Sequence, residues 1–227
     1  MSASLGLSFD EICLAILERL FSHSLQTREE LEPGENPDNI LMQRLQGGED
    51  SALNRIMERW QKPLVEFTFR YVGNRTDAIE LAQEVFVRVY ESRDRYRQSA
   101  KFSSWLFTIA ANLCRNWHRW KSRHPTITLD GDEDEDLHSH NLHERLESPQ
   151  ETPAQIALKI ERIEMVRACI EGLPHDLKTA VLLFEYENLS HQEIGQILNC
   201  TPKAIETRLY RARSILREQL QKLLGEE

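Results

Sequence analysis

Apolar residues recur at every third or fourth position through successive segments of this chain, which is the spacing of one face of an α-helix. Gly, Pro and Asn separate the segments and mark helix ends. The pattern predicts an all-α protein. Helices are expected at residues 8–25, 38–46, 50–72, 76–91, 102–123, 154–171 and 174–187, and two more around a turn between residues 189 and 224. Pro63 is expected either to kink the third helix or to divide it.

The segment 189–213 has the pattern of a helix-turn-helix. Ser190, followed by Glu193, forms a capping box at the start of the first helix. Gly195 is small enough for two helices to cross closely, and Asn199 suits a turn position with positive φ. Thr201 and Pro202 suit the N-cap and the first position of the second helix. A second helix of this kind is able to enter the DNA major groove. Its outer face and flanks carry Lys203, Glu206, Thr207, Arg208, Tyr210, Arg211 and Arg213.

Charge is distributed unevenly along the chain. The formal net charge of −9 would by itself argue against DNA binding. Acid is concentrated in residues 1–37 (2 Lys/Arg, 7 Asp/Glu) and 124–155 (1 and 9), whereas residues 38–123 carry 15 Lys/Arg and 10 Asp/Glu. Residues 200–217 hold five Lys/Arg and one Glu. This local excess favours DNA binding over a helical hairpin whose polar face is only solvated.

A second basic region spans residues 88–123, with nine Lys/Arg and two acidic residues. Aromatic side chains are interleaved with the basic ones, a combination that suits phosphate contact and stacking on unpaired bases. Trp105 lies in the apolar half of the helix at 102–123 and is expected in the core. Trp117 and Trp120 fit either a core position or a stacking role.

Two segments flank or separate these regions. Residues 8–25 predict an amphipathic helix that packs on its own domain or, alternatively, binds a regulatory partner. Residues 124–153 are acidic and lack apolar periodicity, which predicts a flexible linker. Three histidines within it (His138, His140 and His143) are interpreted as solvated, because no helix fixes a metal-binding geometry. Neither a metal nor a cofactor is expected.

Cysteine usage and hydropathy indicate the compartment. The four cysteines show no Cys-x-x-Cys spacing, so reduced structural thiols are expected. No apolar run approaches the length of a membrane span. The sequence therefore predicts a cytoplasmic protein without membrane insertion.

Four segments, in order along the chain, resemble those of extracytoplasmic-function (ECF, group IV, sigma-70 family) sigma factors of bacterial RNA polymerase. They are AIELAQEVFVRVY at 78–90, FSSWLFTIAAN at 102–112, LPHDLK at 173–178 and the helix-turn-helix itself. The resemblance implies a σ2-like domain at 38–123 and a σ4-like domain at 154–227, joined by the linker at 124–153. Residues 1–37 form an N-terminal extension outside the resemblance.

Proteins of this family bind core RNA polymerase, read the −35 and −10 promoter elements and help to melt the −10 region. The resemblance implies as partners the polymerase β′ coiled coil and β flap, promoter DNA, and an anti-sigma factor or another regulator. The implied polymerase contacts are Glu80, Leu81, Gln83, Glu84 and Val87. The implied −10 contacts are Tyr96, Arg97, Asn112, Arg115, Asn116 and Arg119, with Tyr96 and Asn112 at a pocket for a flipped-out base. The implied −35 contacts are the seven outer and flanking residues of the second helix of the helix-turn-helix.

Two positions depart from the family pattern. Ile79 precedes Glu80 where the family has an acidic residue. Glu206 occupies a recognition-helix position that is often basic; its carboxylate could accept a hydrogen bond from cytosine N4 or could avoid phosphate. The promoter sequence therefore does not follow from the resemblance.

Two other functions fit the sequence less well. An ordinary helix-turn-helix repressor or activator would account for residues 189–213 but would leave the segments at 78–112 without a role. An enzyme is disfavoured, because the sequence holds no Gly-rich phosphate loop, no Ser/His/Asp or Cys/His arrangement and no metal-ligand spacing on a helix.

Overall fold

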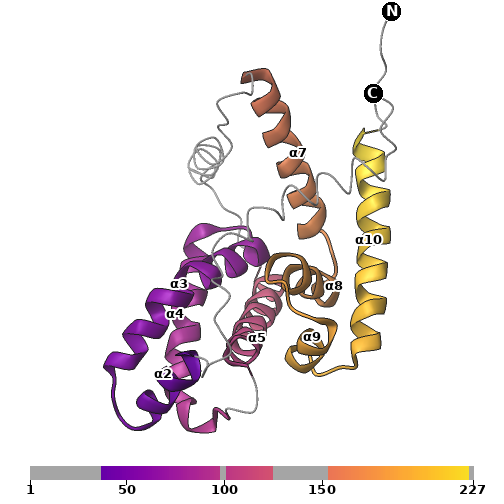
Figure 1. Cartoon of the computed structure of the whole chain (residues 1–227). Helices are drawn as coiled ribbons and strands as arrows, with labels where there is room; N and C mark the ends of the chain where they lie inside the picture. The colour runs from indigo at the N-terminus through magenta and orange to yellow at the C-terminus, as the bar shows by residue number, and fades with distance from the viewer. Residues whose placement is uncertain (1–36, 98–100, 125–152, 225–227) are drawn as a thin grey trace, which may run out of the picture.

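The computed structural model describes residues 37–97, 101–124 and 153–224, and the regular structure of these ranges is entirely helical (Figure 1). A first helical unit contains α2 (Pro37–Gln46), α3 (Ser51–Val72), α4 (Arg75–Glu91), the 3-10 turn η2 (Arg93–Arg95) and α5 (Phe102–Arg123). A second unit contains α7 (Pro153–Glu171), α8 (His175–Val181), the π turn η3 (Leu182–Tyr186), α9 (His191–Ile197) and α10 (Pro202–Leu224). The predicted all-α fold is confirmed. The predicted helix at 8–25 and linker residues 125–152 lie outside the described residues.

The hairpin of α3 and α4 is set by two residues at its bend. Gly73 has a φ of 80° and donates its backbone N–H to the carbonyl of Phe69 at 2.9 Å, which closes α3 in the left-handed conformation that glycine adopts without strain. The side chain of Asn74 then accepts a hydrogen bond from the N–H of Asp77 at 2.9 Å and caps α4. Helix α4 therefore starts at Arg75, and α3 runs through Pro63 without being divided.

Aromatic side chains fill the core of the first unit. The rings of Phe67 and Phe107 meet edge to face at a centroid distance of 5.2 Å, and Trp60 meets Phe102 at 5.7 Å and Phe107 at 6.1 Å. Edge-to-face contacts of this kind are favoured by the ring quadrupoles. Because these rings come from α3 and α5, they fix the position of α5, the helix that carries the predicted −10 contacts.

The helix predicted at residues 174–187 differs from the structure in its second half. The α-helical part, α8, ends at Val181 and continues as the π turn η3, which has one more residue per hydrogen-bonded turn. Asn188, with a φ of 51°, ends the segment. The inserted residue rotates the side chains after Val181 relative to an unbroken helix. Hydrophobic periodicity does not reveal such a change.

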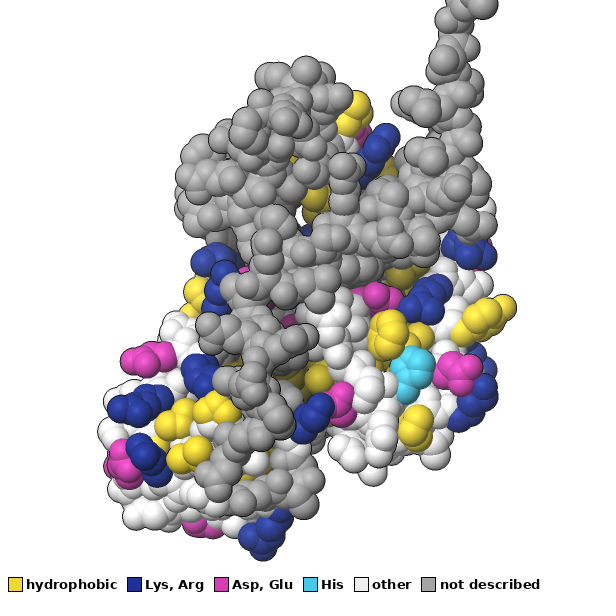
Figure 2. All heavy atoms as spheres, viewed as in Figure 1, with side chains coloured by type: hydrophobic (Ala, Val, Ile, Leu, Met, Phe, Trp, Pro, Cys, Tyr) yellow, Lys and Arg dark blue, Asp and Glu magenta, His cyan; other side chains and the backbone are white. Residues whose placement is uncertain are grey.

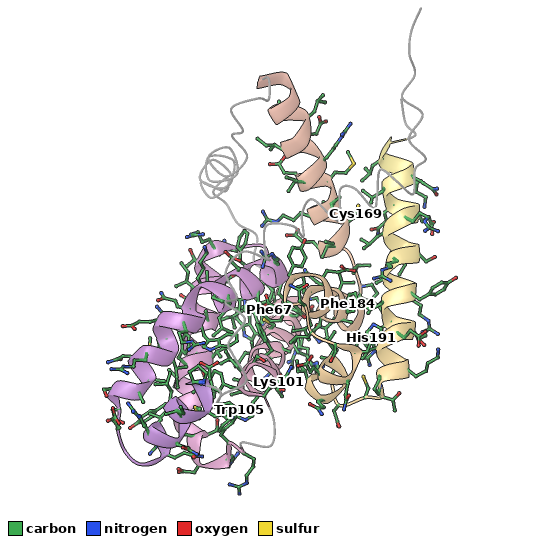
Figure 3. The ribbon with its side chains drawn as sticks, in the orientation of Figure 1. Phe67, Lys101, Trp105, Cys169, Phe184 and His191 are labelled. Atoms are coloured by element: carbon green, nitrogen blue, oxygen red, sulfur yellow. The ribbon has the colours of Figure 1, made fainter. Side chains whose placement is uncertain are left out.

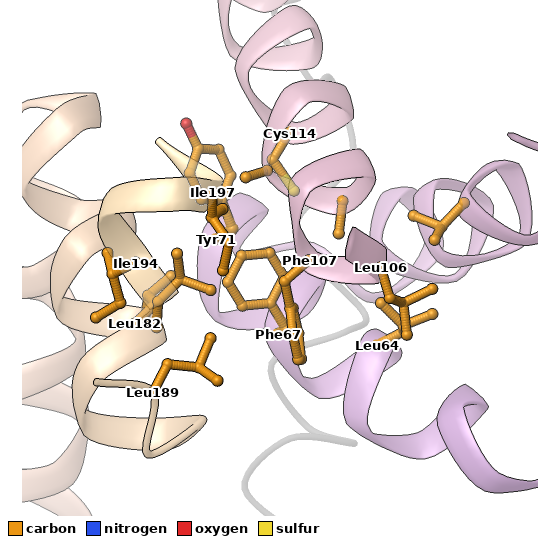
Figure 4. Close-up of a cluster of buried hydrophobic side chains, with 14 of the residues drawn as sticks. Leu64, Phe67, Tyr71, Leu106, Phe107, Cys114, Leu182, Leu189, Ile194 and Ile197 are labelled. Atoms are coloured by element: carbon orange, nitrogen blue, oxygen red, sulfur yellow. The ribbon is translucent and has the colours of Figure 1, made fainter. Parts of the chain in front are cut away.

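The two units share one hydrophobic core (Figure 4). Helix α5 contacts α9, while α3 contacts both η3 and α7. Buried side chains of the second unit face those of the first across this boundary: Leu182, Leu189, Ile194 and Ile197 on one side, and Phe67, Tyr71, Phe107 and Cys114 on the other. We call this boundary the interdomain seam.

Candidate nucleic-acid and polymerase-binding surfaces

The helix-turn-helix consists of α9, its turn and the first part of α10. The hydroxyl of Ser190 accepts from the N–H of Glu193 at 3.3 Å, and the carboxylate of Glu193 accepts from the N–H of Ser190 at 2.9 Å, so the predicted capping box is confirmed. Asn199 has a φ of 51°, as predicted for the turn. The hydroxyl of Thr201 caps α10 by accepting from the N–H of Ala204 at 3.2 Å.

Gly195 brings α9 close to the turn. A Cβ at this position would lie 2.7 Å from the carbonyl oxygen of Cys200, closer than real Cβ contacts allow. The sequence predicts a small residue here because two helices cross closely, and the structure shows that the close neighbour is the backbone of the turn. Glycine at this position therefore allows the turn to pass directly against α9.

Helix α10 separates buried from exposed positions over its first three turns. Ile205, Leu209 and Ala212 are buried against the second unit. Six of the seven predicted −35 contacts are exposed: Lys203, Glu206, Thr207, Tyr210, Arg211 and Arg213. Tyr210 is the most prominent of the exposed large hydrophobic side chains, with 75% of its surface accessible. Figure 2 shows Lys and Arg side chains along the outer edge of α10.

Four charged residues among the seven predicted −35 contacts have partners within the protein. Lys203 Nζ lies 2.7 Å from a carboxylate oxygen of Glu206, and this hydrogen bond lowers the pKa of Glu206. Arg213 lies 3.0 Å from Glu185 of η3, so its guanidinium turns toward the second unit's own surface. Arg208 is only 25% exposed and lies 3.6 Å from Asp176 at the start of α8.

The second basic surface follows the C-terminal half of α5. Asn112, Asn116 and Arg119 are exposed and recur at the spacing of one helix face. Arg115 is half-buried, and its Nε donates to Nε2 of His175 at 2.9 Å. The structure thus brings four of the predicted −10 contacts together on α5, with Arg115 held by the second unit.

The three tryptophans of α5 occupy different environments. Trp105 is half-buried and lies 5.1 Å from the ring of Tyr96, in accord with the core position expected for it. Trp117 is half-buried under the ammonium group of Lys121 at 4.6 Å, and Trp120 is 54% exposed and stacked on His124. Neither Trp117 nor Trp120 is therefore a buried core residue.

Tyr96, which the resemblance places at the pocket for a flipped-out base, is 3% exposed and packs against Phe102 and Trp105 in the free protein. Its hydroxyl donates to the side-chain oxygen of Asn39 at 2.5 Å. The ring is apolar enough to complete the core between α2 and α5, and the hydroxyl finds a partner on α2. The neighbouring Arg97 is exposed, as a DNA contact requires.

The predicted polymerase contacts form a ridge on α4. Glu80, Gln83 and Val87 are exposed, Val87 by 49%, and Leu81 and Glu84 are half-buried at its edges. Ile79, where the family has an acidic residue, adds a further 37% exposed apolar side chain. The ridge is thus an apolar strip bordered by carboxylate and amide groups, a composition typical of a protein-binding surface.

The described residues contain no group of three or more His, Cys, Asp or Glu side chains placed to hold a metal ion. The three linker histidines lie outside the described residues. Among the helices described, none is both long and apolar enough to cross a membrane.

Comparison with known proteins agrees with this arrangement. Residues 56–124 match the family model of Sigma-70 region 2, and residues 163–216 match that of Sigma-70 region 4. The chain is 32% identical over 187 residues to the ECF RNA polymerase sigma-E factor of Haemophilus influenzae, covering 82% of this chain and 97% of that protein. It is 30% identical over 188 residues to the sigma-E factor of Escherichia coli K12, covering 82% and 96%.

Two solved structures share the fold. One is CnrH in complex with the cytosolic domain of CnrY, with a TM-score of 0.59 and 20% identity over 82% of this chain and 99% of that one. The other is the sigma factor RpoE of Bartonella quintana in complex with the anti-sigma factor NepR, with a TM-score of 0.53 and 18% identity over 74% and 96%.

Two helical units, the second with a helix-turn-helix, define a transcription factor of the sigma-70 type. The chain belongs to the ECF family of RNA polymerase sigma factors. It is a transcription initiation factor that binds core RNA polymerase and directs it to promoters.

Proposed function

We propose that residues 38–123 form the σ2 domain and read the −10 element, and that residues 154–227 form the σ4 domain and read the −35 element. One observation carries this assignment. Each unit presents one helix, α5 or α10, whose inner side is buried while its outer side carries amide, hydroxyl and guanidinium groups. These groups are the ones that contact phosphates and base edges in protein–DNA complexes.

In the σ4 domain, we assign base and phosphate contacts to the exposed part of α10. Thr207, Tyr210 and Arg211 lie on its outer face, where a helix in the major groove meets base edges. Lys203 and Glu206 form a pair in the first turn. With its carboxylate held by Lys203, Glu206 is oriented as an acceptor, which favours a cytosine amino group over a phosphate. Arg208 joins this surface once it leaves Asp176, and Arg213 contacts the backbone at its edge.

In the σ2 domain, Asn112 and Asn116 lie where amide groups could hydrogen-bond an extruded base, and Arg119 and Arg97 supply charge for the single-stranded backbone. Arg115 lies between the two asparagines in sequence. Tyr96 packs on Phe102 and Trp105 and so supports the start of α5 beneath this surface.

The ridge on α4, formed by Glu80, Leu81, Gln83, Glu84 and Val87, is assigned to the β′ coiled coil of the polymerase. The β flap is assigned to the σ4 domain. As an initiation factor, the protein is expected to act in the cytoplasm and to leave phosphodiester chemistry to the polymerase. The Bartonella relative of the same fold is bound to an anti-sigma factor. We extend that kind of control to this protein, with an anti-sigma factor or another regulator as partner.

The −10 assignment is tested with Asn112→Ala in the holoenzyme. The variant is expected to reduce permanganate reactivity of the −10 thymines by roughly five- to 150-fold, because a lost hydrogen bond to an extruded base costs on the order of 1–3 kcal/mol. Affinity for closed duplex promoter should change by less than about twofold. Asn54→Ala, an exposed asparagine on α3, is the matched control. Equal losses of melting and duplex affinity would refute the base-contact role.

A further inference from the structure

We infer that Gln46, the last residue of α2, is a positioning residue of the −10 site: its side-chain amide holds the peptide bond before Arg97 and so directs Arg97 toward the single-stranded backbone. The inference rests on the proposed function, because it takes Arg97 as a contact of the −10 strand. The proposed DNA and polymerase contacts all lie on other elements, so the inference gives α2 a part in promoter opening.

The side chain of Gln46 reaches across to the turn η2. Its Nε2 donates to the carbonyl oxygen of Arg93 at 2.8 Å and to that of Tyr96 at 3.3 Å. A primary amide has two N–H donors, so both bonds form at once. Both partners are acceptors, and the nitrogen of the amide, not its oxygen, must therefore face the turn. The carbonyl of Tyr96 belongs to the planar peptide that joins Tyr96 to Arg97, so Gln46 fixes the orientation of that peptide.

The two carbonyls lie at the ends of the turn. Arg93 begins η2, and its carbonyl also accepts from the N–H of Tyr96 at 3.1 Å, the short-range bond of a 3-10 turn. Gln46 therefore bridges the residues at which the chain enters and leaves η2. At the entrance, the guanidinium of Arg93 donates to the carbonyl of Tyr90 at 2.8 Å and lies 4.4 Å from the centre of its ring. The turn is thus attached to α4 as well as to α2.

The end of α2 places Gln46 beside the turn. The N–H of Gly47 donates to the carbonyl of Gln43 at 2.9 Å, and the N–H of Gly48, which has a φ of 89°, donates to the carbonyl of Leu45 at 3.2 Å. A left-handed glycine after the last turn is a common helix end. Gln46 is therefore the last helical residue, and α2 ends where η2 contacts it.

Tyr96 is held at its other end by the same helix. Its hydroxyl donates to Oδ1 of Asn39 at 2.5 Å. Asn39 and Gln46 lie about two helical turns apart, so both amides project from one face of α2. Burial raises the pKa of Tyr96, and the hydroxyl keeps the proton that it donates. Helix α2 thus contacts both the backbone and the side-chain end of the residue that precedes Arg97.

The ring of Tyr96 connects this arrangement to α5. It packs against Phe102 at a centroid distance of 5.9 Å and against Trp105 at 5.1 Å. Figure 3 shows Trp105 at the lower end of the first unit, where Figure 1 places α2. The same contacts therefore fix the turn relative to α5, the helix that carries the other proposed −10 contacts.

Arg97 follows this fixed peptide and has an exposed side chain. Its Nη1 lies 3.5 Å from the carbonyl oxygen of Asp94, at the outer limit of a hydrogen bond, so this contact does not compete with a phosphate. A backbone that is not fixed loses conformational entropy when it binds DNA. Since Gln46 holds the turn, that loss occurs during folding, and Arg97 meets the strand preorganised.

The test uses holoenzyme assembled from the full-length protein and bacterial core polymerase, with a fluorescent single-stranded oligonucleotide that carries the −10 non-template sequence of a transcription-mapped promoter. Gln46→Met removes the amide donor and retains a side chain of similar length and helix propensity. The variant is expected to bind the oligonucleotide about fivefold more weakly, because two hydrogen bonds to the turn are lost. Gln43→Met, at an exposed glutamine of the same helix, is the matched control and should change the affinity by less than about twofold.

A positioning role makes the effects of Gln46 and Arg97 interdependent. In the Arg97→Ala background, Gln46→Met should have no further effect, because the side chain that Gln46 positions is gone. A purely structural role would weaken binding equally with and without Arg97, and that result would overturn the inference. Unchanged affinity of Gln46→Met would overturn it too. Competition for core polymerase should be the same for Gln46→Met as for the wild type, and a matching loss of core binding would count against positioning.

Arg97→Ala by itself tests the proposed function. If Arg97 contacts a phosphate of the single strand, the plot of the logarithm of the binding constant against the logarithm of the salt concentration should become less steep by about 0.7. A change of this size, together with no effect of Gln46→Met, would overturn the inference and leave the proposed function intact. An Arg97→Ala holoenzyme that binds the oligonucleotide like the wild type would overturn the assignment of Arg97, and the inference with it.

Discussion

The ion pair between Asp176 of α8 and Arg208 of α10 must break before Arg208 contacts DNA. Its free energy can be measured. Nη2 of Arg208 lies 3.6 Å from Oδ2 of Asp176, with side-chain exposures of 25% and 56%. Two unit charges at about 4 Å attract by ~1 kcal/mol in water and more near a protein surface. Because the aspartate is more than half exposed, the range of roughly 0.2–1 kcal/mol measured for exposed ion pairs is the better guide. The interaction of Arg208 with DNA must offset this loss.

Asp176→Asn should therefore strengthen binding of the holoenzyme to a −35 duplex by about two- to fivefold, corresponding to ~0.4–1 kcal/mol. Arg208→Ala should weaken binding by ~1–3 kcal/mol if the guanidinium reads a base. If the guanidinium contacts a phosphate, the plot of the logarithm of the binding constant against the logarithm of the salt concentration should become less steep by about 0.9 in Arg208→Ala. In the Arg208→Ala background, Asp176→Asn should have no further effect, because its partner is gone.

The assay is fluorescence anisotropy with a labelled duplex at several salt concentrations, combined with a double-mutant cycle. Glu218→Gln is the charge-matched control, since it removes one carboxylate that pairs with a lysine on α10. Thermal melting corrects for the loss of an acid from the first turn of α8. A gain of equal size from Asp176→Asn with and without Arg208 would contradict a specific coupling between the two side chains, because it would show a general effect of charge.

Three further predictions concern other parts of the molecule. Gly195→Ala should lower the free energy of unfolding of the σ4 domain in urea by ~1–3 kcal/mol, because the new Cβ would lie 2.7 Å from a backbone carbonyl oxygen. Gly172→Ala is the control: its Cβ would have its nearest neighbour at 3.6 Å, and the change should cost less than about 1 kcal/mol. Val87→Asp should weaken core-polymerase binding about tenfold by competition assay, whereas Leu223→Asp, at a similarly exposed site on α10, should not. The stability of the wild type relative to His175→Ala should fall by up to ~3 kcal/mol as the pH drops from about 6.5 to about 4, because the unfolded histidine takes up a proton first. Denaturant unfolding of both proteins across that pH range checks this prediction. A parallel loss of stability in the wild type and in His175→Ala would contradict it.

The local features of the helix-turn-helix could be predicted from the sequence because each depends on a few neighbouring residues. The Ser190–Glu193 capping box, the positive φ of Asn199 and the Thr201 cap are all short-range devices, and all three are confirmed. The separation of buried Ile205 and Leu209 from exposed Tyr210 also follows from helical periodicity alone.

What sequence reasoning missed depends on tertiary packing. The hydroxyl of buried Tyr96 donates to Asn39, 57 residues away along the chain. The seam joins His175 to Arg115 across 60 residues, and neither residue type by itself predicts that pairing. The π turn after Val181 adds one residue to a helical turn without changing the apolar composition. Each case required the spatial arrangement of two or more elements, and periodicity describes only one element at a time.

Multi-round transcription in vitro is the most direct test that this protein directs core RNA polymerase to promoters. Purified protein is combined with bacterial core RNA polymerase and genomic promoter fragments, and the start sites of the transcripts are mapped. We expect discrete transcripts that require both components and that are lost when Arg208 and Arg211 are both replaced by alanine. A protein that binds duplex DNA by itself, never associates with core polymerase and yields no dependent transcript would contradict it.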